Sequence, residues 1–379
     1  MQEYHTAIVG AGPAGLQCAR KLASYGYKVI VFEENKVPGE PNYSTAGIPK
    51  EAFERFKLPK KCIGKPFSKV SFITPNVNLD WGFKKEIGYT LDFKKLKIGM
   101  ADELKGRCEI RYGARVNDLK TDDNGITEIE YVEGGTNSSC KARYFIDASG
   151  FSGVLASRVG LRKKVPCSPA VGIEKVIRIK LPEHYKDNIL FYFGDKFVPY
   201  GYAWVFHFGE DLYKIGVCTY NEHKLLKKKK HLNHYLDEFV LRFGKGKVEE
   251  IHGGSIFVTG GFKKNTWKNL IMIGDTASTI NPILGEGIRH SLYSGDFAAD
   301  TVYMHTRGLT ETLEDYDTII NVYRQNKWIL SKLLSNLIYS SNDTIKDIVI
   351  GRLRNMTPEE MYKCGFGYDF NLLIRKILF

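Results

Sequence analysis

The glycine-rich start of the chain constrains its fold more than any other stretch. A short β-branched run at 6–9 leads into Gly10, Gly12 and Gly15, spaced as G-x-G-x-x-G. This pattern is typical of a buried parallel strand that turns into a helix. Gly10 would allow the tight turn, Gly12 would let a pyrophosphate approach the backbone, and Gly15 would let the helix pack closely on the strand. We therefore expect a phosphate at the N-terminus of this helix.

A carboxylate completes the motif. The second strand expected at 28–32 ends beside Glu33, eighteen residues after Gly15. An acid at this point accepts hydrogen bonds from an adenosine ribose and repels a 2′-phosphate. The strand–turn–helix setting makes the motif far more specific than an isolated glycine pattern. We interpret it as a dinucleotide-binding unit. The motif by itself does not distinguish FAD from NAD, and a glycine turn of another α/β protein remains the alternative.

Composition excludes several classes of protein. The 379 residues are enough for two domains, and no run approaches the eighteen apolar residues of a membrane-spanning helix. The chain shows no charged-then-apolar leader, so export is not expected. Seven scattered cysteines without a C-x-x-C pair favour free thiols in a reducing compartment. We therefore predict a cytoplasmic protein without disulfides or a zinc site.

The net charge of +12 is partly local, in the basic block 224–231. No nucleic-acid motif accompanies this block, so we predict no nucleic-acid partner. The block is interpreted as a solvated face of a helix at 225–243, the alternative being a dock for anionic lipid headgroups. His231 and His234 have an H-x-x-H spacing, but no third ligand is evident and we predict no metal.

Two further strand-to-glycine junctions follow the first. An apolar strand ends at Asp147 and Gly150, and another at 269–273 ends at Asp275. Parallel strands bring such junctions to one sheet edge, where ligands bind. Asp275 could accept hydrogen bonds from a polyol chain, and the helix that follows could stabilise negative charge on a ring, as a flavin requires. The alternative is an ordinary capped helix with a structural Asp275. The loop before this helix contains Pro282, Gly285, Gly287 and Ile288.

Alternation of apolar residues without intervening helices at 171–219 predicts an antiparallel sheet. The fold class is thus α/β, a Rossmann-like domain with an inserted antiparallel β-sheet substrate domain and a C-terminal helical region. We place the first part of the dinucleotide-binding domain at 1–165, the substrate domain at 166–255, the second part at 256–305 and the helical region at 306–379. The apolar-striped tail should be mostly packed core, with room for a lipid-facing surface.

The order of these landmarks resembles one family. GAGPAG at 10–15, DASG at 147–150 and GD…P…GEG at 274–287 are similar to FAD-dependent enzymes that include aromatic hydroxylases and geranylgeranyl reductases. The segment 199–206, P-x-G-Y-x-W-x-F, followed by I-G-V at 215–217, looks like a box of the geranylgeranyl reductases. Those enzymes saturate isoprenoid chains of archaeal lipids, chlorophyll or quinones.

The resemblance implies bound FAD and assigns site residues. Carried over by position, the FAD contacts are Ala14, Glu33, Val116, Asp275, Gly287 and Ile288, and the residue pattern adds Gly10, Gly12, Gly15, Thr45, Gly47, Pro282 and Gly285. Three positions depart from the family pattern. Ser44 stands where the family has a cysteine, Phe93 replaces an arginine beside Lys94, and Cys218 replaces the second glycine of the box.

The implied reaction is reduction of prenyl C=C bonds by hydride from flavin N5. Tyr202, Trp204 and Phe206 alternate along one strand and share a face, where they would bind substrate in an apolar tunnel, unless they are the back wall of an ordinary core. Tyr202, Trp204 and Ser44 are the candidate catalytic residues, with Tyr202 supplying or relaying a proton.

The sequence also bears on the electron donor, the other partners and the alternative functions. No second G-x-G-x-x-G occurs in a strand–helix frame, so the external electron donor would be transiently docked NAD(P)H or a ferredoxin-like protein. The partners expected are a prenyl lipid, a membrane surface contacted peripherally and this redox partner. The main rival is a flavin-dependent monooxygenase or halogenase acting on a small aromatic substrate. Another is a non-catalytic flavin-bound membrane protein.

Overall fold

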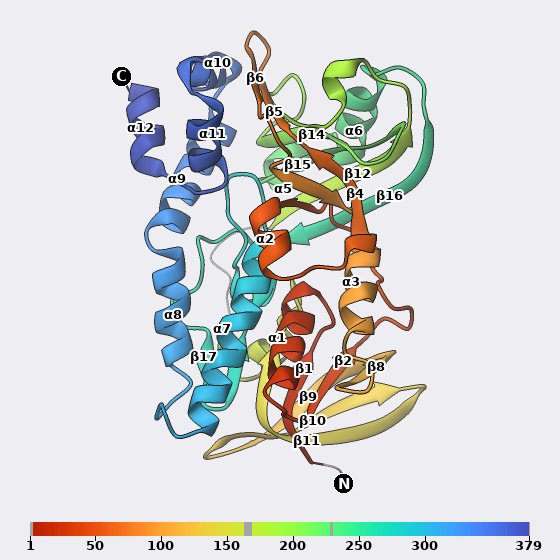
Figure 1. The fold of residues 1–379 in the computed structure, drawn as a ribbon, viewed down its shortest axis with the longest axis vertical. Helices are drawn as coiled ribbons and strands as arrows, with labels where there is room; N and C mark the ends of the chain where they lie inside the picture. Colours follow the sequence, from red (N-terminus) through yellow and green to blue (C-terminus); the bar gives the residue numbers. More distant parts are fainter. Residues whose placement is uncertain (1–2, 163–168, 228–229, 379) are drawn as a thin grey trace.

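The computed structural model describes residues 3–162, 169–227 and 230–378 (Figure 1). The boundary predicted at 165/166, Cys167 and part of the basic block fall outside these residues. The described residues form an eight-stranded sheet, a seven-stranded sheet and a small three-stranded sheet. In Figure 1 the first sheet lies at the bottom, the second at the upper right, and the last helices run up the left side.

The eight-stranded sheet has a parallel centre. Its main path runs β17-β18-β11-β1-β2-β8, with β10 and β9 added beside β11. Val9 pairs with Asp147 in β1 and β11, and Asp147 with Met272 in β18, so the carboxyl ends of these strands share one edge. Strands β10 and β11 form an antiparallel hairpin. The bounds are β1 Glu3–Val9, β2 Val29–Glu33, β8 Glu109–Tyr112, β9 Ala114–Asp122, β10 Gly125–Glu133, β11 Thr136–Asp147, β17 Thr266–Trp267 and β18 Leu270–Met272.

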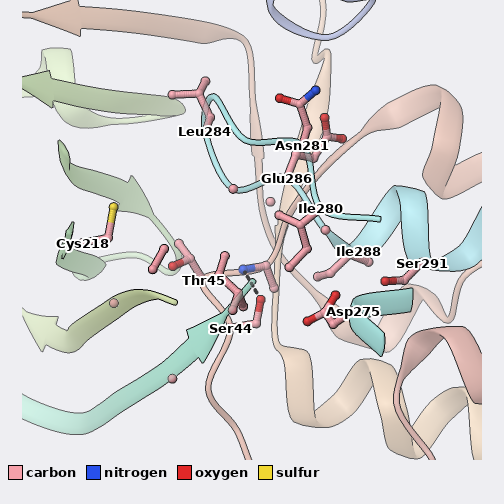
Figure 2. A pocket seen from close by; sticks show the side chains of 18 of the residues that line it. Ser44, Thr45, Cys218, Asp275, Ile280, Asn281, Leu284, Glu286, Ile288 and Ser291 are labelled. Carbon is pink, nitrogen blue, oxygen red and sulfur yellow. Dashed lines mark hydrogen bonds between the residues drawn. The ribbon is translucent and has the colours of Figure 1, made fainter. Parts of the chain in front are cut away.

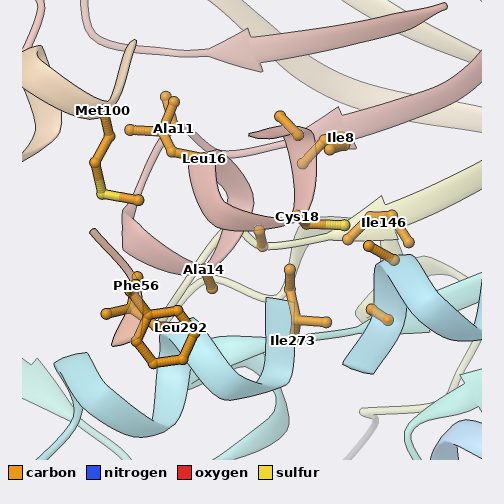
Figure 3. Packing of buried hydrophobic residues seen from close by; sticks show 14 of the residues in the cluster. Ile8, Ala11, Ala14, Leu16, Cys18, Phe56, Met100, Ile146, Ile273 and Leu292 are labelled. Carbon is orange, nitrogen blue, oxygen red and sulfur yellow. The ribbon is translucent and has the colours of Figure 1, made fainter. Parts of the chain in front are cut away.

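Two helices pack closely beside this sheet. Helix α1 (Pro13–Ser24) crosses α7 (Ile288–Thr306) at Gly295, where a Cβ would lie 2.5 Å from the carbonyl oxygen of Ala14. The apolar stripe of α1 is buried at Leu16, Ala19 and Leu22. Figure 3 shows this core, in which side chains of β1, α1, β11 and α7 meet. Close packing of α7 on α1 therefore positions the segment 274–287 against the glycine motif at residues 10–15.

The seven-stranded sheet runs β16-β12-β15-β14-β13-β5-β6. The four strands expected at 171–219 pair antiparallel as predicted. The sheet also contains one parallel pair, between β13 and β5, with Ile189 opposite Val70. Strand β5 forms an antiparallel hairpin with β6, and this hairpin precedes the insertion in the chain and joins the edge of its sheet. Local alternation cannot reveal such a long-range pairing. The domain boundaries stay a prediction. The bounds are β5 Lys69–Ile73, β6 Asn78–Gly82, β12 Ala170–Arg178, β13 Asn188–Phe193, β14 Gly201–His207, β15 Leu212–Thr219 and β16 Lys247–Ile256.

Between the sheets lies a three-stranded sheet with the order β3-β7-β4. Its first strand begins at Gly47, so residues 44–46 are held just before a β-strand. The bounds here are β3 Gly47–Pro49, β4 Ile63–Phe67, β7 Gly88–Leu91, α2 Lys50–Arg55, α3 Phe93–Asp102, α4 Val154–Arg158, η1 Lys60–Cys62 and η2 Glu183–Tyr185.

The single helix expected at 225–243 is wrong. Helix α5 (Glu222–Lys227) and helix α6 (Leu232–Leu241) are separate, and His231 before α6 is extended with φ −86° and ψ 159°. Like charges three and four residues apart destabilise a helix, which is the situation in the lysine run. Within the described residues, no group of three or more His, Cys, Asp or Glu side chains is arranged to hold a metal ion.

The tail is helical as predicted and forms the blue column of Figure 1. Its helices extend from the dinucleotide-binding sheet up to the edge of the seven-stranded sheet. Among the described residues, no helix combines the length and apolar character needed to cross a bilayer. The bounds are η3 Gly274–Ala277, α8 Asp315–Arg324, α9 Lys327–Ser340, α10 Asp343–Gly351, η4 Arg352–Asn355, α11 Pro358–Gly365 and α12 Phe370–Leu378.

Candidate active site

The glycine motif borders a cavity of about 810 Å³. Gly10 has φ +108°, and a Cβ there would lie 2.3 Å from the Ala148 carbonyl oxygen. A Cβ on Gly15 would lie 2.0 Å from the Gly10 carbonyl oxygen, so only glycine lets α1 approach the strand. At Gly12 a Cβ would meet no atom within 4 Å, and no side chain caps α1 there. This leaves the room and the free N–H groups that a pyrophosphate requires.

Glu33 closes the same end of the cavity. Its Oε2 accepts a hydrogen bond from Ala11 N at 2.9 Å, and its Oε1 accepts from Asn35 N at 2.9 Å and Asn35 Nδ2 at 2.6 Å. A carboxylate has about four acceptor positions, so one remains for a ribose hydroxyl. Val116 of β9 lines the cavity nearby.

Asp275 follows β18 at the shared carboxyl edge. Its carboxylate lines the cavity and accepts no hydrogen bond from the described residues. Burial raises the pKa of this carboxyl to about 6, and the charge of Arg162 opposes the shift. Helix α7 begins at Ile288 with Gly287 before it and no capping side chain. An unpaired acceptor next to free helix N–H groups fits the ribityl chain and the ring edge of a flavin.

The loop at residues 44–46 lies across the pocket from Asp275 and Ile288 (Figure 2). Ala46 has φ +56°, a strained value for a residue with a side chain. Buried Lys214 stabilises this turn by donating from Nζ to the carbonyl oxygens of Thr45 and Leu91, both at 2.9 Å. Burial lowers the pKa of Lys214. Ser44 and Thr45 are thus held rigidly at the cavity wall.

A buried carboxylate on β12 joins this loop to the aromatic box. Glu174 Oε2 accepts from Thr45 Oγ1 at 2.7 Å and from Trp204 Nε1 at 3.1 Å, and its Oε1 lies 3.2 Å from His252 Nδ1. Burial disfavours its charge, but His252, Lys214 and Thr45 together hold the pKa of Glu174 below its ordinary value. Glu174 therefore orients both the Trp204 indole and the Thr45 hydroxyl.

The three aromatic residues of β14 share the cavity-facing side of the strand. Tyr202, Trp204 and Phe206 all line the cavity, whereas the alternating Ala203 and Val205 pack on the opposite face. The Tyr202 hydroxyl donates to the Leu284 carbonyl at 2.6 Å, and burial raises its pKa well above the ordinary value.

Beyond the aromatic box the cavity becomes apolar. The tail helices supply much of its wall, so the cavity continues from the glycine motif to the tail. These wall residues are Leu334, Ile338, Val349, Ile350, Leu353, Met356, Met361, Cys364, Phe366, Leu373 and Ile377.

Most residues singled out in the sequence meet in this one cavity, but two do not line it. Gly15 is a buried residue of α1 that faces the backbone of Gly10, and Pro282 lies outside the lining. The predicted residues that do line it are Gly10, Gly12, Ala14, Glu33, Ser44, Thr45, Gly47, Val116, Tyr202, Trp204, Phe206, Asp275, Gly285, Gly287 and Ile288.

Sequence reasoning missed three polar residues of the wall. Glu174 and His252 both line the cavity. The signal that could have identified them is a titratable side chain within a strand-like pattern. Lys97 lies one turn after Phe93, the position where the family has an arginine. It brings a cation to the wall, with Nζ 4.7 Å from the Phe93 ring centre, and burial lowers its pKa to about 8.

Comparison with known proteins identifies the family. The FAD dependent oxidoreductase family matches residues 6–167, and the geranylgeranyl reductase catalytic domain matches residues 173–256. A digeranylgeranylglycerophospholipid reductase of Haloferax volcanii is 30% identical over 390 residues, covering 96% of this chain and 92% of that protein. This chain belongs to the geranylgeranyl reductase family.

Other relatives agree with this assignment. A digeranylgeranylglycerophospholipid reductase of Methanosphaera stadtmanae is 25% identical over 370 residues, covering 94% of this chain and 92% of that protein. FAD is thus the cofactor of this geranylgeranyl reductase family member, an FAD-dependent oxidoreductase.

Solved structures share the fold. A geranylgeranyl bacteriochlorophyll reductase-like protein from Thermoplasma acidophilum has a TM-score of 0.90 at 20% identity, covering all of this chain and 96% of its own. A flavin-dependent brominase has a TM-score of 0.71 at 14% identity, covering 98% of this chain and 94% of its own. The reductase-like protein is thus nearer in fold than the halogenase.

Proposed function

We propose that this chain saturates the C=C bonds of prenyl chains carried by lipids. The observation that carries the proposal is the continuous cavity, which joins a dinucleotide-binding end to a long apolar end past the aromatic box. A small aromatic substrate of a monooxygenase would not need an apolar wall extending over four tail helices, whereas a prenyl chain would.

Reduced FAD supplies a hydride from its N5 when bound. An isolated alkene is a poor hydride acceptor, so the chain must hold it in place, exclude water and provide a proton. Tyr202, Trp204 and Phe206 form an apolar wall against which the alkene can rest. The Trp204 ring is fixed by its bond to Glu174 and by Gly216 opposite, where a Cβ would come within 2.2 Å of the indole.

The proposal includes FAD contacts at the residues predicted for them. The two that do not line the cavity would act indirectly, Gly15 through the packing of α1 and Pro282 through the shape of its loop. Ser44 would act as a polar group beside the ring, in place of the family's cysteine. Its Oγ accepts from Ala46 N at 3.2 Å, so it also stabilises the turn.

The electrons would come from outside the chain, from NAD(P)H or a ferredoxin-like protein. The described residues contain one glycine motif in a strand–helix setting, and α1 follows it. A second resident nucleotide is therefore not part of the proposal, and the donor would dock transiently.

We further propose that the tail helices contact a membrane surface. Helix α9 exposes Ile329, Leu333 and Leu337, which are 55%, 60% and 59% accessible, while its Leu334 and Ile338 line the cavity. The same arrangement recurs at α10 and α12. There Ile348 and Ile374 are exposed beside cavity-lining neighbours, and the exposed arginines of this helical group are Arg352, Arg354 and Arg375. The wall of the apolar cavity is thus one helix thick, with an apolar outer face and cations for anionic headgroups.

The test is a single-turnover experiment without oxygen. Protein with chemically reduced FAD is mixed with a geranylgeranyl lipid, and flavin reoxidation and the mass of the lipid are followed. We expect reoxidation together with a gain of two hydrogens per bond reduced. A flavin that stays reduced with prenyl lipids, but consumes oxygen rapidly with an aromatic compound present, would favour the monooxygenase or halogenase instead.

A further inference from the structure

His252 stands between the reaction cavity and the surface. It lines the 810 Å³ cavity and also a second, polar cavity of about 600 Å³. Only 8% of the residue is accessible. It comes from β16, directly opposite Glu174 of β12 in the strand register. The second cavity is lined by Glu40, Pro41, Asn42, Tyr43, Asp92, Lys94, Glu250, Ile251, His252 and Gly253.

A continuous line of hydrogen-bonding groups passes through His252. Glu250 has a side chain 55% accessible, and its Oε2 lies 2.7 Å from His252 Nε2. On the other side His252 Nδ1 lies 3.2 Å from Glu174 Oε1, and Thr45 Oγ1 lies 2.7 Å from Glu174 Oε2. The nearest partner of each imidazole nitrogen is a carboxylate, which accepts but does not donate when ionised. The Asn42 amide nitrogen lies farther from Nε2, at 3.3 Å, and donates to Glu250 Oε2 at 3.1 Å. The geometry therefore suits an imidazolium that donates from both nitrogens.

We propose that Glu250, His252 and Glu174 conduct protons from the surface cavity to Thr45 in the reaction cavity, a role that rests on the proposed prenyl reduction. Saturating one C=C bond takes a hydride, which brings both electrons, and a proton, which brings none. The Thr45 hydroxyl gives its proton to the reacting carbon. Glu174 is a carboxylate at rest, so it first takes the proton of His252 and then passes it to the Thr45 oxygen, which leaves Glu174 ionised again. His252 recovers its proton from the water of the surface cavity through Glu250. The balance is one proton from solvent per bond.

The electrostatics of the line agree with this role. Burial disfavours the imidazolium, but Glu174 and Glu250 raise the pKa of His252 above its ordinary value. The charge of Lys214 on β15 interacts with the carboxylates of Glu174 and Glu250. The charge of Lys94 on α3 interacts with Glu250, and Lys94 also forms an ion pair with Glu40. A histidine whose protonated form is favoured beside an ionised Glu174 holds a proton for transfer.

Tyr202 is less suited to the task. Its hydroxyl donates to a backbone carbonyl, and rings of Tyr220 and Tyr339 pack around it. Neither a carboxylate nor an imidazole connects it to the surface among the hydrogen bonds of the described residues. A proton lost from Tyr202 would have no route of return, whereas one lost from Thr45 would.

The first measurement is the titration of His252 by ¹⁵N NMR in the FAD-bound protein, assigned with His252→Gln. We expect its pKa to lie above about 6.5, the ordinary value, and to fall in both Glu174→Gln and Glu250→Gln. Glu249→Gln, on the same strand but paired with Arg178, is the matched control and should leave it unchanged. A His252 titration that ignores Glu174 and Glu250 overturns the proposal, whether or not any prenyl lipid reacts.

The second measurement is flavin reoxidation by a prenyl lipid at several pH values. In the wild type the rate should fall as pH rises through the raised pKa of His252. His252→Ala and Glu250→Gln should slow reoxidation tenfold or more and remove this fall, without changing reduction by dithionite. Added imidazole should restore His252→Ala, because the vacated site opens to the surface cavity. Rates, pH profiles and imidazole response equal to the wild type would refute the relay, while failure of the wild type to react refutes the proposed function instead.

Discussion

Individual side chains in this site satisfy two demands that oppose each other. Asp275 is proposed to accept hydrogen bonds from the cofactor, and its place in the cavity wall takes its carboxylate largely out of water. Lys214 is a buried cation that holds the turn at residues 44–46 and also balances the charge of Glu174. A buried charged group of this kind destabilises the folded protein when it is unpaired. It is tolerated when a neighbouring residue or a ligand supplies its hydrogen bonds or an opposite charge.

Replacing Asp275 by Asn separates the two demands. Because burial raises the pKa of Asp275 to about 6 from an ordinary 3.8, the FAD-free protein loses stability as pH rises between these values. Asn does not ionise, so Asp275→Asn should be more stable than wild type by about 1 kcal/mol above this window and unchanged below it. Urea unfolding of FAD-free protein on both sides of the window measures this difference. FAD retention should fall at the same time, and unchanged FAD affinity would reject Asp275 as a ribityl contact.

Replacing Lys214 by Met should be costly. The substitution keeps the length of the side chain but leaves the Thr45 and Leu91 carbonyls without their donor and Glu174 without its nearby cation. We expect a loss of about 2–4 kcal/mol in the free energy of unfolding, measured by urea denaturation. Lys180→Met, at an exposed position following β12, is the control. Equal effects of the two substitutions would show that Lys214 does not stabilise the turn.

At the scale of secondary-structure elements, strand β14 and helix α9 each have two faces that lie in different surroundings. Strand β14 places its aromatic residues in the cavity and its small and branched residues in a separate core. Helix α9 lines the cavity with one side and leaves three large apolar residues accessible on the other. An exposed stripe of this kind has no stabilising role in an isolated chain, so it indicates contact with something apolar.

The outer face of α9 can be tested by Leu333→Asn combined with Leu337→Asn. Because both side chains are already about 60% accessible, the free energy of unfolding should change little. Binding to vesicles containing anionic lipids should weaken severalfold, measured by co-sedimentation. Leu241→Asn on α6, at a position 72% accessible, is the control and should bind as wild type. Equal vesicle binding by all variants would show that α9 does not contact the membrane.

At the scale of the whole molecule, the cavity lies where the two large sheets, the small sheet and the tail meet. No single sheet provides a complete site. The glycine motif and Asp275 come from the dinucleotide-binding sheet, the aromatic box from the seven-stranded sheet and the apolar end from the tail. A ligand that spans this junction should therefore stabilise the parts jointly.

FAD should raise the thermal unfolding midpoint of the FAD-free protein more than ADP does. In the proposed site, ADP would contact the glycine motif and Glu33, whereas FAD would also contact Asp275 and the start of α7. A ligand at 100 times its dissociation constant contributes about 2.7 kcal/mol, and FAD should reach that ratio at a much lower concentration than ADP. Differential scanning fluorimetry over a concentration series makes the comparison. Equal apparent affinities would contradict an extended site in which Asp275 takes part.

Sequence alone determined the parts of this protein that depend on local spacing. The steric roles of Gly10, Gly12 and Gly15, the acid after β2, the alternation of Tyr202, Trp204 and Phe206 and the helical tail all follow from periods and turns within a few residues. These features carry the FAD-binding fold and, with the family resemblance, the reductase assignment.

Tertiary structure alone decided which distant residues meet. The parallel joining of β5 to β13, the line from Glu250 through His252 to Glu174, and the buried Lys214 under the turn at residues 44–46 connect segments far apart in the chain. No local period encodes such contacts, because a charged residue in a strand pattern looks the same whether it faces water or a buried partner. The physical reason is that burial, which gives these charges their roles, is a property of the packed molecule.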